Sequence, residues 1–160
     1  MSKLLDTPSV RRVQTALAAA GSTARVVALA ETARSAADAA RAVGCPLGAI
    51  VKSLVFVIGE QPVMALVAGD RRCDTQALPA AFGTEGRVRR ADAEEVRAAT
   101  GYAIGGVAPV GHALPVLLDA SLARFTELWA AGGHPHCVFP TTLAELARLT
   151  RGQVLATIAT

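Results

Sequence analysis

The run AIVKSLVFVI, residues 49–58, is the strongest structural signal in this chain. It is rich in β-branched side chains and is bounded by Gly48 and Gly59, which favours a strand covered on both faces over a helix. Lys52 is the exception within it. An unpaired buried ammonium costs on the order of several kcal/mol unless a carboxylate, a carbonyl, solvent or an anionic ligand meets it. The alternative is a lysine at a solvated end or edge of the strand, where it snorkels outward or guards against aggregation.

The length and composition predict one domain over residues 1–160. Hydrophobic residues make up 52% and charged residues 18%, but much of the apolar content is alanine. No apolar run approaches the roughly 18 residues of a membrane-spanning helix, and the N-terminal residues lack the apolar core of a secretory signal. Cys45, Cys73 and Cys137 are widely spaced, which indicates neither a disulfide framework nor a zinc site. We therefore expect a cytoplasmic protein with free thiols and no membrane association.

The pattern on either side of the central run predicts an alternation of helices and strands. Residues 63–68 form a second apolar run after the short polar interruption at 59–62, and the two runs predict an antiparallel hairpin. Capping signals begin three helices, at Thr32 or Ser35, at Asp92 and at Thr141 or Thr142. The expected helices span residues 9–20, up to 43, 74–81, 92–100 and up to 149, and the further strands span 25–29, 87–90, 116–119, 128–131, 137–139 and 153–158, with a turn or short helix at 120–125.

The positive charge is almost entirely arginine, because Lys3 and Lys52 are the only lysines. The net charge is +3, and basic groups occur at Arg11-Arg12, Arg71-Arg72 and residues 87–90. Each group could contact phosphates, although solvated arginines on a surface are the simpler interpretation. Aromatic residues make up only 4%, so a stacking platform for single-stranded nucleic acid is not indicated.

A glycine-rich loop follows the helix expected at 92–100. Gly105 and Gly106 are adjacent, and such a pair lets backbone amides approach a ligand and point at carbonyl or phosphate oxygens. A tight structural turn would require the same residues.

Three polar side chains further along the chain offer acid/base or metal chemistry. His134 and His136 share a face only if the backbone between them is extended. Asp119 ends an apolar strand, where it could pair with Lys52 or with an amino group of a ligand, or could cap the turn that begins at Ala120. A metal-dependent hydrolase built from His134, His136 and Asp119 is therefore one alternative, although no second His/Cys pair completes a zinc site.

Taken together, the lysine strand at 50–56, the strand end at 67–70, the loop at 100–112 and the Leu118-Asp119 step resemble the YbaK/ProX/EbsC family. Its members are aminoacyl-tRNA editing domains, free-standing or inserted in bacterial prolyl-tRNA synthetase, that hydrolyse tRNAs carrying the wrong amino acid. The resemblance spans nearly the whole chain. It implies a compact α/β fold, in which a mixed, barrel-like sheet is flanked by helices, and a pocket between the lysine strand and the glycine loop.

The resemblance also implies roles for individual residues. The lysine that matches Lys52 is required for deacylation in the family, and Gly105 and Gly106 would supply backbone donors for the developing oxyanion. Water, helped by the substrate, would be the nucleophile, with no metal or other cofactor. The remaining candidates for substrate contact are Ser53, Asp70, Val107, Ala108, Pro109, Gly111, His112, Asp119, His134 and His136.

One departure from the family concerns the loop, because many relatives have Ser-Pro where this chain has Ala108-Pro109. Small groups such as Ala65 or Ala108, if they lined the pocket, would indicate a small amino acid. The leading hypothesis is a free-standing trans-editing deacylase acting on the acceptor end of a mischarged tRNA, with tRNA(Pro) as a candidate and a prolyl-tRNA synthetase as a candidate partner. The alternative is a non-catalytic module of the same fold that binds tRNA or a synthetase. The amino acid removed stays open, as does a homodimer.

Overall fold

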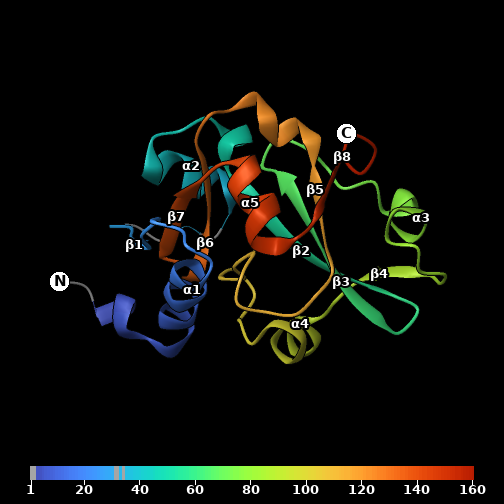
Figure 1. The fold of residues 1–160 in the computed structure, drawn as a ribbon, viewed down its shortest axis with the longest axis horizontal. Coiled ribbons are helices and arrows are strands. Elements are labelled where there is room, and N and C mark those ends of the chain that lie inside the picture. The colour runs from blue at the N-terminus through green and yellow to red at the C-terminus, as the bar shows by residue number, and fades with distance from the viewer. Residues whose placement is uncertain (1–2, 31–32, 34) are drawn as a thin grey trace.

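The computed structural model describes residues 3–30, 33 and 35–160 and contains two β-sheets within them (Figure 1). The larger sheet has the strand order β4-β2-β3-β5-β8, and the smaller has the order β1-β7-β6. The strands are β1 (Val27–Ala28), β2 (Val51–Ile58), β3 (Gln61–Ala68), β4 (Val88–Arg90), β5 (Val116–Asp119), β6 (Leu128–His134), β7 (Cys137–Thr141) and β8 (Gln153–Leu155). The α-helices are α1 (Pro8–Ala19), α2 (Ala36–Val43), α3 (Leu78–Phe82), α4 (Ala93–Thr100) and α5 (Leu143–Thr150). Short 3-10 helices are η1 (Lys3–Asp6), η2 (Leu47–Ala49), η3 (Thr75–Ala77) and η4 (Ala120–Arg124).

The lysine strand β2 pairs antiparallel with β3 along its whole length, as the sequence predicts, and Lys52 lies opposite Val67. β3 then pairs parallel with β5, and β5 with β8, so the sheet is mixed. On its other edge β2 pairs with β4 only from Phe56 to Ile58. Within the described residues, the edge of β2 at residues 51–55 therefore has no neighbouring strand in this sheet.

Both faces of β2 are covered, which confirms the sequence interpretation. Val55 and Val57 belong to a core that includes residues of α1, α4, α5, β6 and β7, whereas Phe56 and Ile58 pack with Leu78 of α3 on the opposite face. Figure 1 shows the smaller sheet on the left with α1 and α2, and the larger sheet on the right with α3 at its outer side. An isolated bridge between Ile50 and Trp129 joins the beginning of β2 to β6.

The helices begin where their capping residues predict. Ser35 caps α2, Asp92 and Glu95 form a reciprocal capping box at α4, and Thr142 caps α5. Thr32, the other candidate for α2, lies outside the described residues. The helix expected at 74–81 is instead a 3-10 turn followed by the short α3, which has proline in its first turn.

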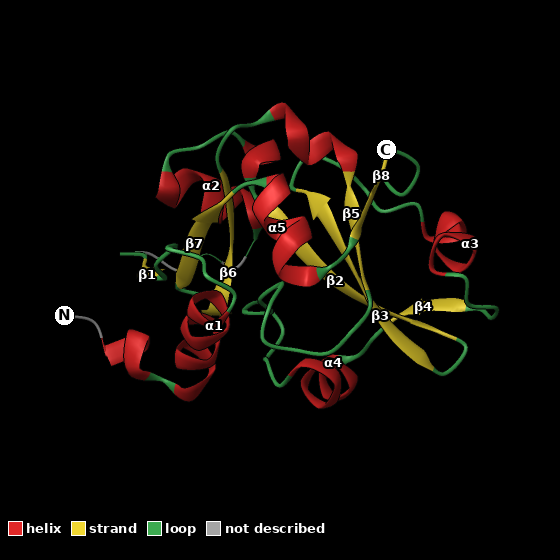
Figure 2. Cartoon of the chain, viewed as in Figure 1, coloured by secondary structure: helices red, strands yellow, loops and turns green. Residues whose placement is uncertain are grey.

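Several strand ends differ from the sequence prediction: for example, β1 is limited to Val27–Ala28, and β7 continues to Thr141. β6 continues through Gly132 and Gly133 to His134 with an irregular register. Position 132 has no room for a larger residue, because a Cβ there would lie 2.6 Å from Val26. β8 ends at Leu155 rather than 158. The loop at residues 101–115, between α4 and β5, contains no helix or strand (Figure 2). Among the described residues, no helix is long and apolar enough to cross a membrane.

Candidate active site

A cavity of about 290 Å³ lies beside the open edge of β2. Its apolar lining includes small side chains on α2 and β6 (Ala36, Ala39, Ala130 and Ala131), Ala33 before α2, the single tryptophan Trp129, and larger side chains such as Ile50, Val55 and Val138. The glycine loop contributes Ile104, Gly105 and Val107, and the polar groups at the cavity are Lys52, Ser53, Arg90, His134 and Ser35. The lysine strand and the glycine loop therefore border one cavity.

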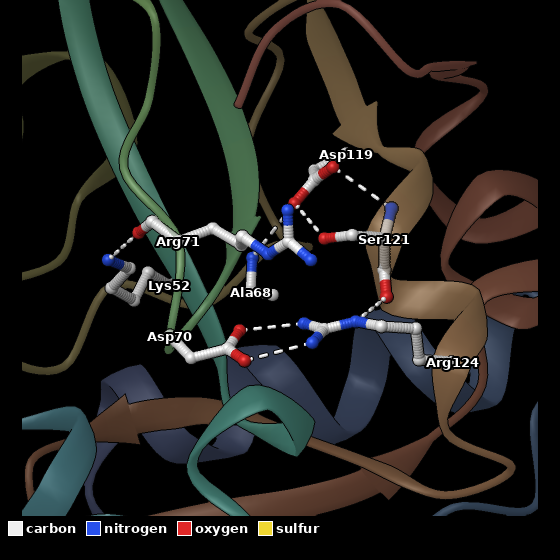
Figure 3. Close-up of polar contacts among 7 residues, drawn as sticks. All are labelled: Lys52, Ala68, Asp70, Arg71, Asp119, Ser121 and Arg124. Atoms are coloured by element: carbon white, nitrogen blue, oxygen red, sulfur yellow. Dashed lines mark hydrogen bonds and ion pairs between the residues drawn. The ribbon is translucent and has the colours of Figure 1, made fainter. Parts of the chain in front are cut away.

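The Lys52 ammonium is met by a backbone carbonyl and not by a carboxylate. Its Nζ donates a hydrogen bond to the carbonyl oxygen of Arg71 at 2.6 Å (Figure 3). Burial lowers the pKa of Lys52, and the positive charges of Arg72 and Arg90 add to this effect, while Asp70 opposes it. The ammonium can donate three hydrogen bonds, so two donors remain beyond the one that Arg71 accepts.

Ser53 faces the other side of the sheet from Lys52, because successive residues of a strand alternate between its two faces. Its hydroxyl oxygen is buried and has no hydrogen-bond partner among the described residues. A buried hydroxyl left unsatisfied costs about 1–3 kcal/mol. Ser53 and Lys52 thus both border the cavity, although their side chains lie on opposite faces of the sheet at the unpaired edge of β2.

The two glycines of the loop differ in what they offer. The Gly106 amide donates to the carbonyl of Ala103 at 3.0 Å, so the donor expected there is used within the loop. No hydrogen bond of the Gly105 amide occurs within the described residues, and Gly105 lines the cavity with a positive φ of 96°. Gly105 therefore remains the candidate backbone donor of the pair.

His134 lines the cavity from the end of β6. Its Nδ1 accepts a hydrogen bond from the amide of His136 at 3.1 Å, so the neutral ring carries its proton on Nε2. Burial lowers the pKa of His134, and His136 lowers it further, which favours this neutral form. His134 is therefore a hydrogen-bond donor in its neutral state, while His136 does not line the cavity.

The two carboxylates expected to contact a ligand, Asp70 and Asp119, instead bind other protein groups (Figure 3). Asp70 forms a two-pronged ion pair with Arg124, at 2.6 and 2.9 Å, and Arg124 lowers the pKa of Asp70. Asp119 accepts bonds from the amide and hydroxyl of Ser121, at 2.9 and 2.5 Å, and a longer one from the amide of Ala68. Asp119 thus has the turn-capping role that was its alternative interpretation.

The other loop candidates build the loop and do not line the cavity. Ala108 and Pro109 are buried, and His112 bridges the Pro109 carbonyl and the Leu114 amide through its two ring nitrogens. A side chain at Gly111 would collide with the Tyr102 hydroxyl. Ala65 is likewise fully buried in the core, so neither Ala65 nor Ala108 shapes the cavity as a small lining group.

The metal-dependent alternative finds no support in this geometry. Across residues 3–30, 33 and 35–160 there is no group of three His, Cys, Asp or Glu side chains that could hold a metal ion. Both oxygens of Asp119 accept hydrogen bonds, from the amide and hydroxyl of Ser121 and from the amide of Ala68.

Sequence reasoning did not assign several cavity residues. Arg90 lies in a basic group that the sequence reveals, but its place at the cavity depends on where β4 stops pairing with β2. Trp129 is recognisable only as the single tryptophan, and the α2 alanines carry no polar signal at all. Ile104 is 58% exposed at the cavity, which is unusual for isoleucine and becomes meaningful only in the structure.

Comparison with known proteins places this fold and cavity in a class. Residues 30–149 match the aminoacyl-tRNA editing domain family, and the chain belongs to that family. A crystal structure described as a "putative trans-editing enzyme for prolyl tRNA synthetase" superimposes with a TM-score of 0.86 at 47% identity, covering 93% of this chain and 96% of that one. The family resemblance and the α/β fold predicted from the sequence are thereby confirmed.

Two curated relatives carry named activities. The protein named "Putative Cys-tRNA(Pro)/Cys-tRNA(Cys) deacylase EbsC", from Enterococcus faecalis, is 28% identical over 122 residues, which are 74% of each chain. A proline–tRNA ligase of Solidesulfovibrio magneticus is 36% identical over 89 residues, or 56% of this chain. The matched region is only 15% of the ligase, so the similarity concerns one part of that enzyme.

Proposed function

We propose that this chain is a deacylase that acts in trans and hydrolyses the ester of a mischarged tRNA, with tRNA(Pro) as the first candidate. The observation that carries the proposal is that Lys52 and Gly105, far apart in sequence, border one cavity in an aminoacyl-tRNA editing domain. The relatives linked by name to prolyl-tRNA synthetase support the choice of tRNA and make a synthetase a candidate partner.

In the proposed reaction, the ester carbonyl lies between the Lys52 ammonium and the Gly105 amide. Water attacks the carbonyl carbon, and the negative charge that develops on its oxygen is stabilised by these donors. The bond between the acyl carbon and the ribose oxygen then breaks, and the ribose oxygen leaves with a proton from the attacking water. Free amino acid and deacylated tRNA result. One such donor typically contributes about 10²–10³-fold to kcat.

The groups at the cavity favour substrate assistance over a protein base. Neutral His134 presents a protonated Nε2, and burial raises the pKa of the Cys137 thiol, so neither supplies a ready base or nucleophile. The vicinal ribose hydroxyl would position the water and relay its proton. A cysteinyl substrate offers a second route, in which its own sulfur attacks the acyl carbon and the ribose oxygen leaves with the thiol proton. Water then opens the resulting thiolactone to give free cysteine.

The apolar wall favours a small, uncharged aminoacyl side chain. Ala36 and Ala39 on α2 face the cavity together with Ala130 and Ala131 on β6, and none of these side chains can pair with a charged group. A buried charge without a partner is disfavoured, and Lys52 and Arg90 would repel a basic side chain, so basic amino acids would be excluded.

The polar rim favours an anionic partner. The part of the structure that is described shows no ion pair of Arg90 or Lys52 with a carboxylate, and both lie at the cavity. Phosphates near the acceptor end of a tRNA are the matching groups.

The non-catalytic binding module is the competing function, and the Ala108 loop is what permits it. Ala108 is buried and does not line the cavity, so a hydroxyl missing there removes no polar group from the cavity itself. This favours the deacylase.

The test is hydrolysis of a panel of tRNA(Pro) charged with cysteine, alanine, serine, threonine or proline. We expect turnover of at least one small non-cognate ester and sparing of Pro-tRNA(Pro). Binding of tRNA(Pro) without turnover of any ester would favour the binding module instead.

A further inference from the structure

The peptide group between Arg71 and Arg72 has hydrogen bonds on both of its sides. Its carbonyl oxygen accepts from the Lys52 Nζ at 2.6 Å, and its amide donates to the carbonyl of Thr160 at 2.9 Å. A peptide group is planar and rigid, so these two bonds are coupled by covalent geometry. A short chain of hydrogen bonds therefore runs from Thr160 to the ammonium of Lys52.

The segment at residues 158–160 holds this peptide group in place through an antiparallel pairing. The Thr160 amide donates to the Arg72 carbonyl at 2.9 Å, and the Asp74 amide donates to the Ile158 carbonyl at 2.7 Å. Cys73 and Ala159 are the bridge partners at the centre of this pairing. The pairing is separate from β8, which ends at Leu155.

A buried side chain anchors the 158–160 segment to the sheet. Ile158 has no solvent exposure and packs in the core that contains Phe56 of β2 and Leu78 of α3. Phe56 lies on the same face of β2 as Lys52, because the two residues are separated by an even number of positions. The segment thus covers the face from which the lysine side chain extends.

We propose that Ile158 and Thr160 are positioning residues for Lys52, acting through the Arg71–Arg72 peptide group. Asp70, Arg72, Cys73 and Arg90 are the charged and titratable groups whose charges act on the ammonium, and Arg72 and Cys73 belong to the segment that residues 158–160 hold. The effect of this positioning on catalysis rests on the proposed function. The position of Lys52 itself can be measured in the protein without substrate.

The test uses the fact that Lys3 and Lys52 are the only lysines. In protein labelled with ¹³C at the lysine Cε, each of the two lysines gives one NMR signal. The signal that is missing in Lys52→Arg belongs to Lys52. Thr160→Pro removes the amide that donates to the Arg72 carbonyl, and so weakens the pairing that holds the Arg71–Arg72 peptide group, although the Thr160 carbonyl still accepts from the Arg72 amide. The matched Thr160→Ala keeps both bonds. We expect the Lys52 signal to move toward its position in the urea-unfolded chain in Thr160→Pro and to stay unchanged in Thr160→Ala.

A second pair of variants tests the anchor. Ile158→Ala should move the Lys52 signal, whereas Leu146→Ala, an equally buried change on α5, should not. Hydrolysis per folded molecule should fall about tenfold in Thr160→Pro and Ile158→Ala, since small misplacements of a catalytic group are costly. If Ile158→Ala does not fold, Thr160→Pro still tests the positioning role, because Thr160 is exposed and its replacement should leave the core intact.

An unmoved Lys52 signal in folded Thr160→Pro would overturn the positioning role. If instead the proposed function is wrong, wild-type protein will hydrolyse no aminoacyl-tRNA. The NMR comparison would still show whether residues 158–160 position Lys52.

Discussion

Gly106 lies so close to His134 that a Cβ on it would stand 2.8 Å from both the backbone nitrogen and the Cα of the histidine. The glycine loop and the end of β6 are therefore in backbone contact at this point. Gly105, the neighbouring residue, lines the cavity, so its position depends on this contact.

Gly106→Ala should separate the loop from β6 and displace Gly105. We expect deacylation to fall at least about tenfold, and stability to fall by about 1–3 kcal/mol from overpacking. Gly44→Ala is the control, because Gly44 has a positive φ of 82° and a Cβ on it would meet nothing within 4 Å. It should lose about 1 kcal/mol of stability and keep its rate per folded molecule. Equal activity of folded Gly106→Ala and wild type would contradict this role.

Ala39 and Ala40 are neighbours on α2 and both are buried, but only Ala39 lines the cavity. Ala39→Val should reduce hydrolysis of threonyl ester more than that of alanyl ester, because the added methyl groups occupy the space for the substrate side chain. Ala40→Val has the same helix propensity cost and should leave the ratio of the two rates unchanged. The ratio is measured as kcat/KM for each ester, and identical ratios in both variants would argue against this wall as the side-chain pocket.

Arg90 and Arg89 are adjacent on β4 and point to opposite faces, since strand residues alternate. Arg89 is held by Glu95 through two bonds of 2.7 Å, whereas Arg90 lines the cavity. Arg90→Ala should raise KM for aminoacyl-tRNA and reduce the salt dependence of binding by about 0.7 in the log–log slope, as expected for one lost phosphate contact to a single strand. Arg89→Ala should leave the slope unchanged. A slope that Arg90→Ala does not alter would remove Arg90 from tRNA binding.

The pKa of Lys52 should lie below its ordinary value of 10.5, with burial as the main cause. The folded chain then binds fewer protons than the unfolded chain between the two pKa values, so the free energy of unfolding should rise with pH through that window. Both proteins are compared in a Cys73→Ser background, because Lys52 lowers the pKa of the Cys73 thiol, and Lys52→Met should lack this rise. Urea unfolding at a series of alkaline pH values gives the difference, and an NMR titration that puts Lys52 at or above its unfolded value would contradict the prediction.

The sequence predicts most of the regular elements because local signals specify them. The β2–β3 hairpin follows from two apolar runs and a short polar turn, and α4 from the Asp92–Glu95 box, and both occur as expected. The pairing of residues 72–74 with 158–160 was beyond such reasoning. It depends on a long-range contact between short, ordinary segments that carry no local signal.

For the candidate site too, the sequence indicates some residues correctly and leaves others to the three-dimensional structure. Lys52 stands out because a charge interrupts an apolar strand, and Gly105 because adjacent glycines mark a special backbone, and both border the cavity. Asp70 and Asp119 carry equally suggestive chemistry, but their partners Arg124 and Ser121 are brought to them by the fold. The sequence therefore indicates which side chains can do chemistry, while three-dimensional pairing determines which remain available.

Single-turnover hydrolysis shows whether ester hydrolysis depends on Lys52. The substrate is the non-cognate aminoacyl-tRNA(Pro) that wild type turns over fastest, and the variants are Lys52→Ala and, as a matched control, Lys3→Ala. We predict a fall of about 10²–10³-fold for folded Lys52→Ala and the wild-type rate for Lys3→Ala. A folded Lys52→Ala protein that hydrolyses the ester at the wild-type rate would exclude Lys52 from the reaction.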